Sequence, residues 1–156
     1  PMDNLLEEFI KASGTLQYLR IEGDKRGRID RIFPAITLNS RNLRAINLRN
    51  FDIKSLPILM QLNPNLYHLE VYTKNLDDTF FNMLARELLP TIKSLRLVLQ
   101  KGDTLEMSEE SFIHFLEVTH QNLKYLSLHP LAFKKSHRKL IMSYGIKLAA
   151  SWNHSM

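Results

Sequence analysis

The sequence repeats one short phrase five times, and this repetition limits the possible folds more than any other feature. Each copy has an aliphatic residue, two variable residues and an aliphatic–any–aliphatic triplet; the copies begin at Leu16, Leu43, Leu66, Ile92 and Leu123. The alternation in the second half of each phrase predicts a short strand with one buried face. Because such a strand unit cannot bury its own faces alone, we expect the units to stack on one another.

Between the phrases the apolar spacing changes to that of a helix. Asp77 to Thr79 can cap a helix that runs to Pro90, with an apolar side made by Phe80, Phe81, Leu84 and Leu88. A second helix is expected from Ser108, with an inner side of Phe112, Phe115, Leu116 and Thr119. Weaker helical patterns cover residues 29–38 and 54–62. Each repeat unit is therefore expected to consist of a strand, a loop, a helix and a segment that leads back to the next strand.

These units resemble the leucine-rich-repeat family, whose repeats read L-x-x-L-x-L followed by a less regular convex segment. The resemblance spans about residues 15–130 and is greatest to the ribonuclease-inhibitor and F-box-associated subfamilies. It implies an α/β fold: a right-handed solenoid with about five parallel strands on the concave face and helices on the convex face. It also implies a module for partner recognition, such as the adaptor of a ubiquitin ligase, although no F-box-like segment is visible.

We expect a single domain over residues 1–156, because the chain is too short for two typical domains. Residues 1–14 are predicted as an N-terminal helical cap and residues 15–131 as the repeats. Residues 132–156 are predicted as a C-terminal cap and tail, with a basic helix over residues 137–150. Terminal caps of this kind cover the open ends of a repeat stack.

Composition argues against several other classes of protein. Hydrophobic residues make up 44% of the chain and charged residues 24%, which is typical of a soluble globular protein and not of a disordered one. No apolar stretch approaches the roughly 20 residues that cross a bilayer, and no leader is apparent, so we expect no membrane partner. The absence of cysteine excludes thiolate sites and is compatible with an intracellular location, cytoplasmic or nuclear.

In a parallel array, strand residues alternate between the core and the concave face, which predicts fifteen outward positions on the five strands. Tyrosine and arginine occupy six of them, and these residue types are the ones most often found as binding anchors. We therefore expect a protein partner to bind through Tyr18, Arg20, Arg49, His68, Glu70, Tyr72, Arg96, Tyr125 and His129. The alternative at this point is an ordinary exposed sheet face.

A second alternative is nucleic-acid binding through the basic segments 20–54 and 121–156, which sum to +5 and +6. These charges have little of the aromatic interleaving that binds single strands, which favours a solvated face over a nucleic-acid site. The one basic glycine-containing loop, residues 23–28, is read as a flexible connection.

Motifs for catalysis or metal binding do not stand out. His114, Glu117 and His120 lie on one expected helix, but His120 is six residues from His114 and should point away from it. Neither a zinc-protease motif nor a phosphate-binding glycine loop is present. We therefore expect a non-enzymatic protein with no cofactor, no metal and no small-molecule substrate.

Overall fold

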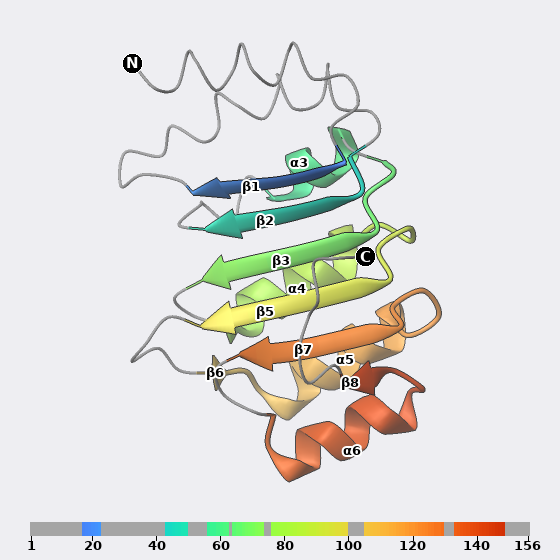
Figure 1. Cartoon of the computed structure of the whole chain (residues 1–156). Coiled ribbons are helices and arrows are strands. Elements are labelled where there is room, and N and C mark those ends of the chain that lie inside the picture. Colours follow the sequence, from blue (N-terminus) through green and yellow to red (C-terminus); the bar gives the residue numbers. More distant parts are fainter. Residues whose placement is uncertain are drawn as a thin grey trace.

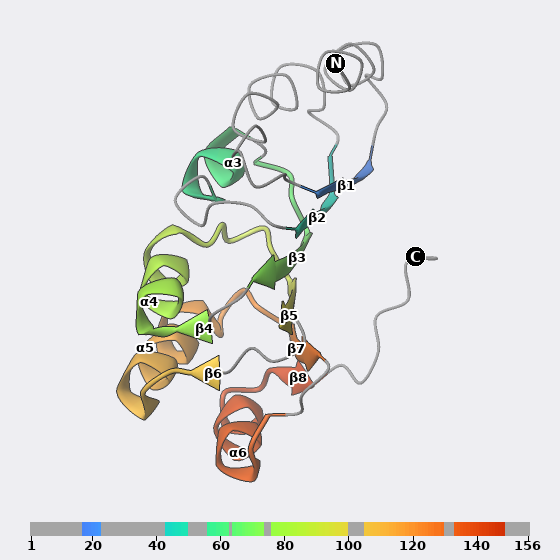
Figure 2. The same ribbon diagram turned by 90° about the vertical axis from the view of Figure 1, so that its left-hand side faces the viewer.

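Six parallel strands form one sheet, and helices cover one of its faces (Figures 1 and 2). The computed structural model describes residues 17–22, 43–49, 56–62, 64–73, 76–99, 105–129 and 133–148. The sheet runs in chain order through β1 (Tyr18–Glu22), β2 (Ala45–Arg49), β3 (His68–Thr73), β5 (Ser94–Leu99), β7 (Tyr125–His129) and β8 (Lys147–Leu148). Together with the alternating helices, this order confirms the predicted α/β leucine-rich-repeat solenoid.

The repeated phrases lie in register across the sheet. Leu19 pairs with Ile46, which is the partner of Leu69, and the same row continues through the equivalent aliphatic residues of β5, β7 and β8. The first residue of each described phrase is also buried: Leu43, Leu66, Ile92 and Leu123. Stacking identical positions in this way produces continuous aliphatic rows, which is how a repeat protein builds its core.

Helices follow β2, β3, β5 and β7, the first three at the predicted places. They are α3 (Leu56–Leu62), α4 (Asp78–Glu87), α5 (Glu109–Thr119) and α6 (Lys135–Ser143). Asp77 caps α4 by accepting a hydrogen bond from the Phe80 backbone N–H at 3.0 Å. Ser108 caps α5 in the same manner, with the Ser111 N–H at 3.2 Å. The capping residues that the sequence indicated therefore begin both helices.

A second, two-stranded parallel sheet lies on the helical side, where β4 (Leu76–Asp77) pairs with β6 (Leu105–Glu106) (Figure 2). The sequence pattern did not predict these short strands. Next to them, the Asp78 carboxylate accepts a hydrogen bond from the Ser108 backbone N–H at 2.6 Å. This bond lowers the pKa of Asp78 and ties the start of α4 to the start of α5.

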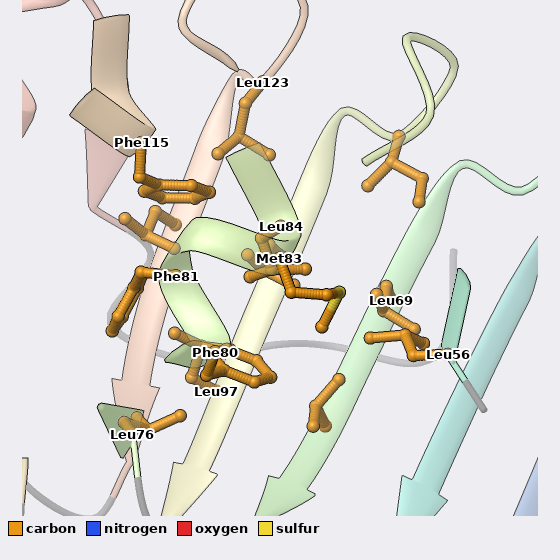
Figure 3. Close-up of a cluster of buried hydrophobic side chains, with 14 of the residues drawn as sticks. Leu56, Leu69, Leu76, Phe80, Phe81, Met83, Leu84, Leu97, Phe115 and Leu123 are labelled. Carbon is orange, nitrogen blue, oxygen red and sulfur yellow. The ribbon is translucent and has the colours of Figure 1, made fainter. Parts of the chain in front are cut away.

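The core lies between the sheet and the helices (Figure 3). Phe81 of α4 is fully buried and contacts Phe80, Phe112 and Phe115 edge-on, with ring centroids 5.3–5.6 Å apart. Phe112 in turn stacks on Phe133 at 5.9 Å. These aromatic contacts join α4, α5 and the segment before α6 into one layer over the aliphatic rows of the sheet.

The C-terminal region differs from the predicted cap. The helix was expected over residues 137–150, but α6 ends at Ser143 and residues 147–148 form the sixth strand of the sheet. Gly145, at φ 77°, allows the helix to end in a Schellman motif, in which Ile146 N–H bonds Ile141 C=O at 3.2 Å and Gly145 N–H bonds Met142 C=O at 3.0 Å. The expected long helix is therefore a shorter helix followed by a short strand, which the apolar spacing alone did not distinguish from one continuous helix.

Some predicted features lie outside the described residues: the N-terminal cap at 1–14, the basic loop at 23–28 and the helical pattern at 29–38. Within the described part of the chain, no helix is both long and apolar enough to span a bilayer.

The imidazole of His137 packs on the core at the start of α6. Its ring contacts Phe112 edge-on at 5.3 Å, and its Nδ1 is buried with no hydrogen-bond partner among the described residues. Burial lowers the pKa of His137, and Lys134 lowers it further, whereas Glu109 opposes the change. The folded state therefore favours the neutral imidazole.

Phe81→Ala should lower the free energy of unfolding by about 3–5 kcal/mol, because the change leaves a cavity among three aromatic rings. The exposed neighbour on the same helix provides the control, and Asn82→Ala should change stability by less than about 0.5 kcal/mol. Urea denaturation of both variants measures the difference. Equal effects of the two substitutions would contradict the core described above.

Stability should fall as the pH drops below about 6.5, because the unfolded chain then binds a proton at residue 137 before the folded protein does. The loss should continue down to the lowered pKa of the folded state. His137→Phe should reduce this slope in thermal melts between pH 7.5 and 5, whereas His114→Gln should retain it because His137 is still present. An unchanged slope in His137→Phe would show that other groups cause the pH dependence.

Candidate functional site

The outward strand positions form three rows on the sheet face opposite the helices, which we call the concave face (Figures 1 and 2). The first row is Tyr18, Ala45, His68, Ser94, Tyr125 and Lys147. The second row is Arg20, Asn47, Glu70, Arg96 and Ser127. The third row is Glu22, Arg49, Tyr72, Val98 and His129. The register thus brings all nine candidate residues onto one face, two strand spacings or less from β3.

A buried polar network occupies the centre of the concave face. Glu70 is only 1% exposed; one carboxylate oxygen lies 2.9 Å from Arg96 Nε, and the other accepts a hydrogen bond from the Asn47 amide. Arg96 remains 16% exposed at its side chain. A buried carboxylate needs such partners, since an unpaired charge in this position would be costly. Glu70 therefore holds its two neighbours in place across three strands.

The first row contains a second buried pair. His68, 1% exposed, lies with Nδ1 2.9 Å from the hydroxyl of Ser94, which is also buried. In the third row, the Arg49 guanidinium stacks over the Tyr72 ring at 3.8 Å, and both side chains are half-buried. Val98 on the next strand is buried, although its alternation places it on the concave face. The centre of this face is thus largely buried, and its polar side chains contact one another across the strands.

The exposed candidate residues lie toward the ends of the array. Tyr18 and Tyr125 expose 40% and 37% of their surface, and Arg20 and His129 are also exposed. The alternation in the sequence predicted which face of the sheet these side chains lie on, but it did not predict how far each one is buried. His68 and Glu70 have the same outward direction as Tyr125, yet both are covered. Of the candidate residues, Tyr18, Arg20, Tyr125 and His129 are therefore accessible on the concave face, whereas His68 and Glu70 are buried.

The histidines on α5 do not form a metal centre. Among the described residues, no group of three histidine, aspartate or glutamate side chains is placed to hold a metal ion. His114 and Glu117 are exposed, whereas the His120 ring packs against Tyr144 at 5.3 Å and its Nδ1 lies 2.9 Å from the Glu117 carbonyl oxygen. The predicted separation of His120 from His114 therefore agrees with a structural role at the contact between α5 and α6.

Comparison with known proteins identifies a similar fold. A solved tropomodulin C-terminal domain from Caenorhabditis elegans superposes with a TM-score of 0.66, covering 91% of this chain and 90% of that one at 17% identity. That domain is a leucine-rich-repeat domain, so the resemblance found in the repeated phrases is confirmed at the level of the fold. No protein-family model and no curated protein matches the sequence.

A double-mutant cycle should detect the ion pair at the centre of the concave face. Glu70→Gln and Arg96→Met should each destabilise the protein, and their combined effect should fall short of the sum by about 1–3 kcal/mol, since the first change already removes the interaction. Urea denaturation provides the four free energies. Glu110→Gln, at an exposed carboxylate of α5, is the control for loss of charge. Additive effects within about 0.5 kcal/mol would mean that the pair contributes little.

Proposed function

We propose that this protein is a non-enzymatic module that binds a protein partner through its concave face. The observation that carries the proposal is the in-register arrangement of tyrosine and arginine side chains around the Glu70–Arg96 pair. Tyrosine and arginine bury a large area while keeping a polar group available, which suits them to protein interfaces. A stable complex should bury on the order of 1,200–2,000 Å² in total.

The paired side chains at the centre of the concave face favour recognition by shape complementarity over attraction by charge alone. Arg96 is fixed by Glu70, and Arg49 is stacked on Tyr72, so these side chains lose little additional freedom when a partner binds. Tyr18 and Tyr125 flank this centre on β1 and β7, where their exposed rings can contact the partner. The proposed contact residues therefore combine a prearranged centre with accessible aromatic groups on either side.

Nucleic-acid binding is the alternative function, through residues 20–54 and 121–156. All six basic side chains of the second segment are exposed, but four belong to α6 or its N-cap, away from the concave face. A glutamate at the centre of the concave face also disfavours a phosphate-binding surface there. The adaptor role in a ubiquitin ligase is a narrower version of our proposal and depends only on the subfamily resemblance.

Replacing the exposed concave residues should abolish partner capture without unfolding the protein. Tyr125→Ala combined with His129→Ala should reduce the yield of bound partner at least about tenfold, because both side chains are accessible on β7. Asn82→Ala combined with Arg86→Ala, at exposed positions of α4, is the matched control on the convex side. Affinity capture from nuclease-treated source cells, followed by mass spectrometry, compares the three proteins.

Proteins captured equally by the concave-face variant and the wild type would contradict the proposal. Capture that disappears after nuclease treatment would instead favour the nucleic-acid alternative. The thermal midpoint of each variant is measured alongside the capture. Only a variant that melts at the same temperature as the wild type tests binding and not folding.

A further inference from the structure

An open groove lies at the N-terminal ends of the strands, apart from the concave rows. Its volume is about 710 Å³, and we call it the edge groove; its lining residues are Gln17, Arg44, Asn65, Tyr67, Pro90, Thr91, Lys93 and Asn122. Four of them, Gln17, Arg44, Tyr67 and Lys93, occupy the second position of successive repeat phrases. The same stacking that forms the sheet therefore aligns these four side chains along its edge.

The backbone fixes this alignment. The carbonyl oxygen of Arg44 accepts hydrogen bonds from the N–H groups of Tyr67 and His68, at 2.7 and 2.9 Å, and the carbonyls of Gln17, Tyr67 and Lys93 make the same paired contacts with the next repeat. Because these carbonyls already accept two bonds each, they are poor acceptors for an added strand. A ligand in the edge groove must therefore be recognised mainly by the side chains.

The ionised residues that line the edge groove are both cations. Arg44 and Lys93 are its two ionised residues, and none of its eight lining residues is a carboxylate. The Lys93 ammonium donates to the Pro90 carbonyl oxygen at 3.0 Å, which holds the cation at the rim. In contrast to the concave face, where Glu70 neutralises Arg96, no lining residue neutralises the groove cations. This arrangement is complementary to carboxylates.

Tyr67 lies between the two cations in the repeat order and exposes 41% of its surface. The Arg44 guanidinium carbon is 6.0 Å from its ring centroid. The phenol ring provides an apolar surface, while Asn65, Thr91 and Asn122 add neutral hydrogen-bonding groups to the lining. Such a mixture suits a peptide whose acidic side chains flank an apolar one.

We propose that the edge groove binds an extended acidic segment of a protein partner, with carboxylates on Arg44 and Lys93 and an apolar side chain on Tyr67. From β1 to β7 the groove crosses four strand spacings, roughly 19 Å, which corresponds to about six extended residues. Two cations and one exposed aromatic ring are few for a nucleic acid, which binds through many phosphates and stacked bases. The proposal rests on the proposed function only in taking the partner to be a protein.

A labelled hexapeptide with four glutamates around a central Phe-Phe pair tests the edge groove directly. In NMR titrations of the ¹⁵N-labelled protein at low salt, the peptide should shift the amide signals of residues 44, 67 and 93. Arg44→Gln combined with Lys93→Gln should weaken binding about tenfold or more, because two charge-assisted contacts are lost. Lys135→Gln combined with Lys139→Gln, at exposed positions of α6, removes the same charge elsewhere and should weaken binding less than twofold.

The edge-groove proposal would be overturned by any of these results: no binding by the peptide, equal weakening by the two double variants, or tighter binding by a hexauridylate that also depends on Arg44 and Lys93. A peptide with glutamine in place of glutamate should bind at least about tenfold more weakly, and equal affinity would also overturn it. The concave face is tested separately by Tyr125→Ala and His129→Ala. If these two substitutions leave partner capture unchanged while the peptide still binds, the proposed function is rejected and the edge-groove proposal is still supported.

Discussion

The in-register stacking of the repeated phrases is the constraint on which the rest of the structure depends. Each strand is short, and its aliphatic residues become buried only because the next repeat places equivalent residues beside them. The same register lines up the outward residues in rows and the second phrase residues along the edge groove. Core, concave face and edge groove are therefore three consequences of one repeat geometry.

The concave face and the edge groove differ in how the repeat geometry arranges their charges. On the concave face, neighbouring strands place a glutamate between an asparagine and an arginine, so that charge is neutralised within the protein. Along the edge groove, Arg44 and Lys93 lie just before β2 and β5, and the equivalent residue before β3 is Tyr67. The two cations are thus separated by a tyrosine, and none of the lining residues is a carboxylate. A packed, paired surface suits shape recognition, whereas a spaced cationic groove suits a charged extended chain.

On its C-terminal side, the described sheet is extended by a short strand that follows α6. Gly145 allows the chain to leave α6 and return to the sheet, where Lys147 and Leu148 pair with β7. The His137 ring and Phe133 pack on the aromatic layer of α5, which continues the core to this end. The helix-and-strand plan of the repeats is therefore kept to the last described residues.

The sequence by itself determined the repeat, the direction of each strand residue and the capped starts of α4 and α5, because alternation and capping are local properties of the chain. Only the tertiary structure decided which outward residues are accessible. Tyr125 and Glu70 follow the same alternation, yet one is exposed and the other is buried against Asn47 and Arg96. Likewise, the repeated phrase gives Gln17, Arg44, Tyr67 and Lys93 equivalent positions, but only the stacked structure brings them together with Asn65, Thr91 and Asn122 in one groove. Burial and pairing depend on neighbours from other repeats, and those neighbours are set by the stacking of whole units.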